Sequence, residues 1–298
     1  MNMVIDRGLD LLKPDEMLQD EFEAFKLHYA TRDGRSHPGL NMWAEQGRPD
    51  YLKRYRLFAR YLATAPTDAV TPENVNTNRG DPHKASGSFT CIFWYGLLGF
   101  EEGNHYSLTN LQNGGFSKDE CLQGIAMACV YSGPRGMETM ANVLKTFEWK
   151  EPVEPPHFRE DWVNDKSKMQ AGLDFSTADL LPGELSRIEQ WYGDTIGEVP
   201  AYVRFLGRHN PPLLKAYRNR WENLLTTLPN QLLPTTMFQI HMLRQDRAGI
   251  RENALLARAW GVGHEEMVHA LSAWMVFGSV QMATMAQEVV GDLFDNWD

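Results

Sequence analysis

Apolar residues recur three or four positions apart along most of the chain, a period that is typical of amphipathic helices. The clearest case begins at Ser117-Lys-Asp-Glu120, where the serine hydroxyl and the glutamate carboxylate can each accept a backbone N–H. Gly133-Pro134 is a signal for the end of that helix. Its expected buried stripe consists of Leu122, Ile125, Ala126 and Cys129. Because no stretch alternates apolar and polar residues as a strand would, we expect an all-α protein.

Two pairs of segments within the chain resemble each other. Residues Pro38–Arg56 align without gaps to Pro200–Arg218, and Gly115–Tyr131 align to Gly261–Phe277. An internal repeat of this kind predicts two tandem helical units that pack together. In the second copy the capping positions are Gly263 and Glu266. Its expected buried stripe consists of Met267, Leu271, Trp274 and Met275.

Changes in composition indicate where the units begin and end. A chain of 298 residues is long enough for two units of ordinary domain size. Residues 66–86 are rich in Pro, Asn, Asp and Thr and have no helical period, which predicts a surface loop inserted in the first unit only. Residues 151–185 are rich in Pro and in charge, so we expect them to connect the units. The two units are therefore expected at residues 1–150 and 186–298.

Charge and cysteine content narrow the class of protein. The 39 Asp and Glu residues exceed the 29 Lys and Arg residues, and no long basic run occurs, so nucleic acid is not an expected partner. The N-terminus lacks the apolar core of a signal peptide and no long apolar run follows, which predicts a cytoplasmic protein without a membrane partner. Cys91, Cys121 and Cys129 form no Cys-x-x-Cys pair, and we expect buried, inert thiols.

The motifs Gly115-Phe-Ser117-Lys-Asp-Glu120 and Tyr131-Ser-Gly133-Pro134 resemble the second half of the helical hairpin in the carboxymuconolactone decarboxylase / AhpD-like family. The second copy keeps Gly261 and Glu266, and its residues Gly197–Arg218 look like the family's approach to the first helix. This resemblance implies two AhpD-like helical units. It also implies a homo-oligomer, because family members associate through their helices into rings.

The family's activity depends on the residues that precede the glycine. The peroxidase branch carries Cys-x-x-Cys followed by a histidine, and because this chain lacks that motif we do not expect thiol peroxidase activity. The decarboxylase branch carries a glutamate four residues before a histidine, a spacing that Glu101 and His105 share. The resemblance thus implies a cofactor-free lyase doing acid–base chemistry on a small oxygenated, carboxylate-bearing molecule. Its catalytic residues would be His105, Glu101, Glu102 and Tyr131, and residues 66–86 could cover them as a lid.

The second copy has Gly249 and Asn253 at the carboxylate and histidine positions, so we expect it to be chemically degenerate. It presents Arg244, Arg247 and Arg251 at helical spacing, and this row is either a binding site for a substrate carboxylate or a solvated basic face.

Two alternatives remain open at the level of sequence. Glu102-Gly-Asn-His105 and Glu266-Met-Val-His269 both match the Glu-x-x-His ligand pair of di-iron carboxylate bundles, although they stand at non-equivalent places in the two copies. The second alternative is a non-catalytic binding or assembly module on the same scaffold. We expect no metal site and no cofactor.

Overall fold

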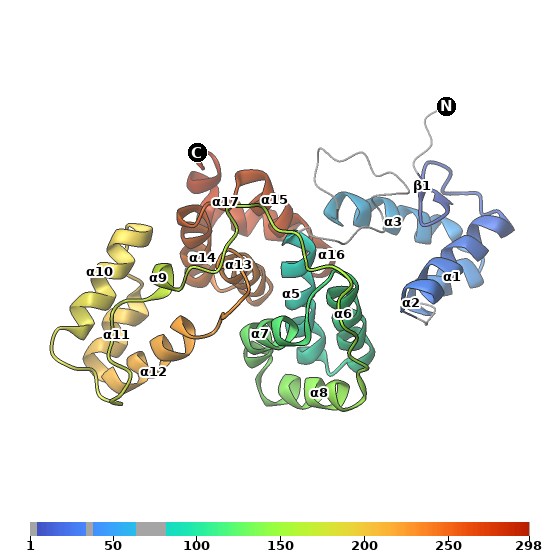
Figure 1. Cartoon of the computed structure of the whole chain (residues 1–298). Coiled ribbons are helices and arrows are strands. Elements are labelled where there is room, and N and C mark those ends of the chain that lie inside the picture. Colours follow the sequence, from blue (N-terminus) through green and yellow to red (C-terminus); the bar gives the residue numbers. More distant parts are fainter. Residues whose placement is uncertain (1–4, 34–37, 64–81, 298) are drawn as a thin grey trace.

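The computed structural model describes residues 5–33, 38–63 and 82–297, and within these ranges helices are the main regular structure (Figure 1). Its only described strands are β1 (Ile5–Asp6) and β2 (Leu9–Asp10), an antiparallel pair with Ile5 opposite Asp10. The prediction of an all-α protein is confirmed.

The helices fall into two series along the chain. The first series comprises α1 (Gln19–Asp33), α2 (Pro38–Glu45), α3 (Pro49–Ala63), α5 (Pro82–Leu98), α6 (Glu101–Asn113), α7 (Lys118–Ala128), the 3₁₀ turn η1 (Cys129–Ser132) and α8 (Gly133–Thr146). The second comprises α9 (Lys166–Met169), α10 (Glu184–Ile196), α11 (Ala201–His209), α12 (Pro211–Glu222), α13 (Leu232–Arg244), α14 (Arg247–Ala259), α15 (His264–Ser272), α16 (Met275–Gly278) and α17 (Gln281–Phe294). In Figure 1, α1–α3 and α10–α12 lie at opposite ends, with α5–α8 and α13–α17 between them.

The two series meet where α5 packs against α13. The Thr90 hydroxyl on α5 donates a hydrogen bond of 2.7 Å to Gln239 Oε1 on α13, and both residues are buried. Phe89, Phe93 and Phe238 belong to one apolar cluster that runs through this contact. The centre of the molecule is therefore a shared core rather than two separate ones.

A buried ion pair joins α1 to α3. Lys53 Nζ lies 2.9 Å from a Glu21 carboxylate oxygen, and the lysine side chain is fully buried. The same carboxylate accepts the backbone N–H groups of Asp10 and Leu18. Burial alone raises the pKa of Glu21, but these hydrogen bonds and Lys53 outweigh it and hold the pKa below its ordinary value.

The same arrangement joins α10 to α12. Lys215 Nζ lies 2.9 Å from the buried Glu184 carboxylate, which accepts the backbone N–H groups of Asp174 and Leu181. The residues before the glutamate also match, since Asp6-Arg-Gly-Leu-Asp10 corresponds to Gln170-Ala-Gly-Leu-Asp174. These contacts support the prediction of tandem units without testing the unit boundaries.

Part of the segment expected to connect the units contacts α10 and α12. The buried Arg218 side chain donates to the Met169 carbonyl at 2.9 Å, and Trp191 Nε1 donates to the Lys168 carbonyl at 3.1 Å. Residues between Lys168 and Leu181 thus contact the helices that follow them. The boundaries at 150 and 186 stay a prediction.

The predicted helix caps are confirmed. At the start of α7, Glu120 accepts the N–H of Ser117 at 2.8 Å, and the Ser117 hydroxyl accepts the N–H of Glu120 at 3.3 Å. At the start of α15, Glu266 accepts the N–H of Gly263 at 2.6 Å. Helix α7 was expected to continue to Gly133 but ends at Ala128. The 3₁₀ turn η1 follows it, and α8 begins at Gly133.

The expected buried stripe of α7 is only partly correct. Leu122 and Ala126 are exposed, whereas Cys121 and Gly124 are buried. The cause is Phe89 on α5, whose ring lies where a side chain at Gly124 would stand, 1.9 Å from an ideal Cβ. Close packing against this ring turns the face of α7 toward Gly124. In the second copy Met267 and Trp274 are buried, and Leu271 and Met275 are partly buried.

The predicted inserted loop at residues 66–86 is wrong at its C-terminal end. Residues 82–86 belong to α5, which begins at Pro82, a residue that suits the first turn of a helix. Residues 66–81 lie outside the described part of the chain, and so does the proposed lid over the site.

Cys121 and Cys129 are buried and Cys91 is half-buried, all three as free thiols. Burial raises the pKa of the Cys91 and Cys121 thiols to about 12, so both remain protonated and unreactive at neutral pH. The predicted inert thiols agree with this environment.

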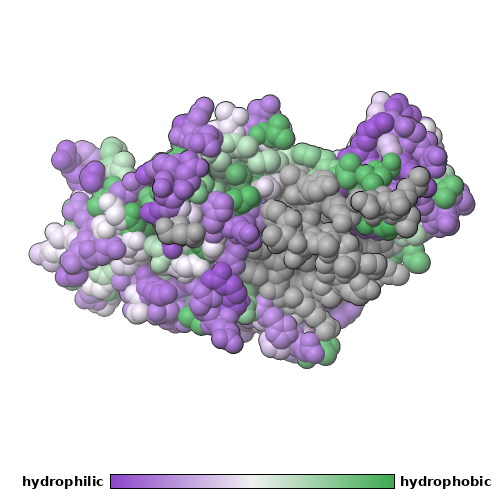
Figure 2. All heavy atoms as spheres, turned by 90° about the horizontal axis from the view of Figure 1, so that it is seen from above, coloured by the Kyte–Doolittle hydropathy of each residue, from purple (hydrophilic) through white to green (hydrophobic). Residues whose placement is uncertain are grey.

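One face of the described chain is mainly polar. Seen from above, hydrophilic residues cover most of the described surface, and apolar residues form separate patches (Figure 2). Within the ranges that the structure describes, none of the helices combines the length and the apolar character needed to cross a bilayer.

Candidate functional site

A cavity of about 520 Å³ lies among α11, α12, α13, α14 and η1. It is of the size that small-molecule sites usually have. Its polar and aromatic lining residues are Tyr131, Tyr202, Tyr217, Trp221, His241, Asp246, Glu252 and Asn253. Tyr131 follows α7 in the first series, whereas all the others belong to the second, so both halves of the chain build the cavity wall.

The tight turn between α13 and α14 brings His241 and Asp246 together. Gln245 ends α13 in the left-handed conformation, with a φ of 56°, and Asp246 follows as the N-cap of α14. The Asp246 carboxylate accepts the N–H of Gly249 at 3.2 Å, and its other oxygen lies 2.9 Å from His241 Nδ1. Burial lowers the pKa of His241, and Asp246 offsets only part of that effect, so the imidazole favours its neutral form.

Gly249 allows the imidazole to lie against α14. A Cβ at this position would stand 2.3 Å from His241 Nδ1, closer than any real contact. The sequence interpretation of Gly249 as a lost carboxylate therefore missed its packing role, since only glycine leaves room for the ring.

Glu252 ends a chain of hydrogen bonds that leads from the interior to the cavity. Arg218 donates to the Tyr192 hydroxyl at 3.5 Å, the Tyr192 and Tyr202 hydroxyls are 2.5 Å apart, and Tyr202 donates to Glu252 Oε1 at 3.2 Å. Burial raises the pKa of Glu252 to about 7, although Tyr202, Tyr192 and Arg218 act in the opposite direction. Glu252 can therefore exist in both protonation states near neutral pH.

Arg218 is held firmly at the inner end of this chain. Its guanidinium group forms a buried ion pair of 2.7 Å with Glu222 and lies over the rings of Trp191 and Trp221, at 4.4 and 4.9 Å from their centres. The guanidinium is a permanent cation held between a carboxylate and two indole rings. Its hydrogen bond to Tyr192 orients the tyrosine hydroxyls that lead to Glu252.

Of the four predicted catalytic residues, the cavity includes Tyr131. Its ring centre lies 6.0 Å from that of His241, and burial raises the pKa of its phenol. Glu101 and Glu102 are exposed at the start of α6, and Glu101 accepts a hydrogen bond of 2.9 Å from Asn142. His105 is half-buried with its ring centre 5.1 Å from that of Phe147. These three residues of α6 lie outside the cavity lining.

The predicted arginine row has protein partners. Arg244 donates to the Tyr131 carbonyl at 3.0 Å, which ties α13 to η1. Arg247 pairs with Glu288 at 2.8 Å, and Arg251 pairs with Asp292 at 3.3 Å, both on α17. None of the three arginines lines the cavity, so the row fastens helices together there.

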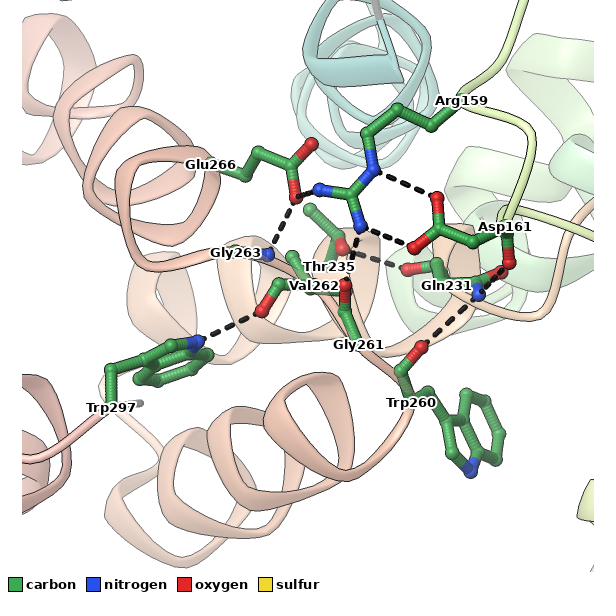
Figure 3. Close-up of polar contacts among 10 residues, drawn as sticks. All are labelled: Arg159, Asp161, Gln231, Thr235, Trp260, Gly261, Val262, Gly263, Glu266 and Trp297. Carbon is green, nitrogen blue, oxygen red and sulfur yellow. Dashed lines mark hydrogen bonds and ion pairs between the residues drawn. The ribbon is translucent and has the colours of Figure 1, made fainter.

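The second Glu-x-x-His motif has a structural environment of its own (Figure 3). Glu266 caps α15 and also accepts a 3.1 Å hydrogen bond from Arg159 of the connecting segment. Arg159 in turn contacts Asp161 and the Gly261 carbonyl, so this carboxylate takes part in fastening the segment to the α14–α15 turn. Across the described ranges, no three His, Cys, Asp or Glu side chains form a group that could hold a metal ion.

Sequence reasoning missed His241, Asp246 and Glu252. His241 stands near the end of α13 and Asp246 caps the start of α14, whereas the helical spacing expected for Arg244, Arg247 and Arg251 ran across the turn between them. Glu252 carries a weaker signal, because a glutamate between an arginine and an asparagine looks like an exposed helix position.

Comparisons with protein-family models, with curated proteins and with solved structures found no match to this chain. The likeness to the AhpD-like family therefore rests on the motifs of the sequence alone.

Proposed function

We propose that the chain is an acid–base enzyme that moves a proton on a small molecule bound in the cavity beside Glu252. The observation that carries this proposal is the position of Glu252, which joins the cavity to a buried hydrogen-bond chain. A general acid or base works best when its pKa lies near the operating pH, and burial brings the pKa of Glu252 to about 7.

Glu252 would act as the base in its ionised form. A proton taken from the substrate would reside on one oxygen of the carboxyl group. The Tyr202 hydroxyl would continue to donate its hydrogen bond to the other oxygen, Oε1. In the reverse direction the protonated carboxyl would return the proton. Tyr192 and Arg218 support this cycle, because they keep the Tyr202 hydroxyl pointed at Glu252.

His241 and Asp246, at the turn between α13 and α14, would supply a second group that can exchange a proton. A neutral imidazole can donate or accept one proton, and Asp246 stabilises the charged form that appears when it accepts. The two groups together allow a proton to leave one atom of the substrate and arrive at another, as isomerisation requires.

The proposal keeps the class of reaction that the family resemblance implies and changes the residues. Cysteine-independent proton transfer of the isomerisation type remains the reaction that we favour. The catalytic group moves from His105 on α6 to Glu252 on α14, because the cavity lies at α14.

Proton abstraction can be measured without knowledge of the full reaction. The protein would be incubated in deuterated water with a panel of small ketones and lactones, and deuterium at carbon would be read by mass spectrometry. We expect exchange in the wild type and a loss of about 10²- to 10⁴-fold in Glu252→Gln.

His105→Ala is the matched competitor in this experiment. If the cavity is the site, this variant should exchange deuterium at the rate of the wild type. Exchange that His105→Ala abolishes and Glu252→Gln leaves intact would refute the proposal and restore the α6 site. A protein that exchanges no member of the panel in any form would favour the binding-module alternative.

A further inference from the structure

The described wall of the cavity is formed by carboxylate, phenol, indole and imidazole groups together with apolar side chains. Its titratable lining residues include two carboxylates, Glu252 and Asp246, and one imidazole, His241. Among the described residues that line the cavity there is neither lysine nor arginine. An anionic ligand would be placed beside these carboxylates, and like charges at short range cost several kcal/mol. The wall therefore selects against the carboxylate-bearing substrate that the sequence indicated.

Three arginines that contact wall residues or their partners are bound to other protein groups. Arg218 pairs with Glu222. Arg220 donates to the Ala126 carbonyl at 3.0 Å, and its guanidinium lies 5.9 Å from the centre of the Tyr131 ring. Arg244 donates to the backbone carbonyl of Tyr131. These contacts hold Tyr131 in place rather than offering a charge to a ligand.

Four aromatic side chains complete the wall: Tyr131, Tyr202, Tyr217 and Trp221. The rings of Tyr202 and Tyr217 meet edge to face, with centres 5.5 Å apart and planes at 78°. Burial raises the pKa of both phenols well above the ordinary value, so they stay neutral. The faces of neutral, electron-rich rings attract cations, and substituted ammonium ions are ligands that sites lined with such rings bind.

We infer that the cavity binds a small organic cation, a substituted ammonium ion, with its charge between the Glu252 carboxylate and the rings of Tyr202 and Tyr217. This inference rests on the site of the proposed function and adds the class of ligand. The volume of about 520 Å³ leaves room for the ammonium group together with a short polar or apolar chain.

The test compares three probes of the same shape that differ in charge. Choline is the cation, 3,3-dimethylbutan-1-ol is its uncharged carbon isostere, and 3,3-dimethylbutanoate is an anion of similar size. Dissociation constants would be measured by ligand-observed NMR with the full chain at about pH 8, where Glu252 is mainly ionised. We expect choline to bind at least about tenfold more tightly than the alcohol, and the anion to bind more weakly than both.

Variants assign the preference to the named groups. Glu252→Gln should lose most of the preference for choline, and Tyr217→Leu should weaken choline binding while leaving the alcohol nearly unaffected. Glu288→Gln is the matched control, because it removes an exposed carboxylate that pairs with Arg247 outside the cavity. Each variant would first be checked for a wild-type melting temperature.

The two proposals fail in different ways. Equal binding of choline and the alcohol, or tighter binding of the anion, would overturn the ligand class even if Glu252 proves essential for deuterium exchange. A preference for choline that Glu252→Gln abolishes would uphold the ligand class even if no exchange is found. A preference that Glu252→Gln and Tyr217→Leu leave intact would place the cation elsewhere and overturn the inference.

Discussion

The ionisation of Glu252 should be visible in the stability of the whole fold. Its pKa rises from an ordinary 4.5 to about 7 on folding, so the folded protein binds more protons than the unfolded chain between these values. Stability from this group is complete below about pH 4.5 and is lost as the pH rises through about 7. Relative to Glu252→Gln, the wild type should lose at most about 3 kcal/mol of unfolding free energy over this interval.

Chemical denaturation at a series of pH values would measure this difference. Other groups titrate in both proteins, so the comparison with Glu252→Gln isolates the single carboxyl. A pH dependence that is identical in the two proteins would show that Glu252 keeps an ordinary pKa, and its role as an acid or base near neutral pH would fall with it.

Gly249 is the residue on which the position of His241 depends. In Gly249→Ala the new Cβ would overlap the imidazole, which must move into the cavity or force α13 and α14 apart. We expect a loss of about 1–3 kcal/mol of stability and impaired deuterium exchange. Gly193→Ala on α10 is the control, because no atom lies within 4 Å of its ideal Cβ. That variant should gain about 0.5–1 kcal/mol from helix propensity.

At the scale of the helices, the buried pair of Glu184 and Lys215 fixes α10 against α12. Glu184→Ala would leave the lysine charge buried and deprive the N–H groups of Asp174 and Leu181 of their acceptor. Removing one partner of a buried ion pair typically costs about 3–5 kcal/mol. Thermal or urea unfolding of Glu184→Ala should show a loss of this size, whereas the exposed Asp194→Ala on the same helix should change stability by less than about 0.5 kcal/mol. Equal effects of the two variants would mean that the pair adds nothing to the fold.

The local sequence was sufficient to predict an all-α fold and the helix caps, but it was less successful in predicting which face of a helix is buried. The cap formed by Ser117 and Glu120 uses residues three positions apart, so the sequence alone was sufficient to place it. The buried face of α7 depends instead on Phe89, a residue of another helix, and the pattern of α7 could not contain that information. The glutamates that bind Lys53 and Lys215 were missed for the same reason, since each pair is distant in sequence.

At the scale of the whole molecule, the candidate site depends on how the two series of helices meet. Tyr131 from the first series faces His241 of the second, and Phe277 from the second faces Tyr95 of the first, with ring centres 6.4 Å apart. Tyr131 and Phe277 occupy matching places in the repeat, so each series places an aromatic ring over the other. The motif at Tyr131 was recognisable in the sequence. Its contact with His241 was not, because no local feature of the sequence specifies which helix of the other series Tyr131 meets.

The unequal cores of the molecule predict unequal local stability. In the described chain, α1–α3 pack around a small cluster formed by Leu9, Leu11, Phe25 and Leu52, separate from the main core. Their counterparts α10–α12 contribute Ile188, Tyr192, Val203 and Leu214 to the large cluster that runs through α5 and α13. Burial of apolar area provides most of the protection against opening, so backbone amides of α1–α3 should exchange with deuterated water at least about tenfold faster than those of α10–α12. Hydrogen exchange read by mass spectrometry compares the two groups within one sample, and equal protection would mean that α1–α3 open only together with the main core.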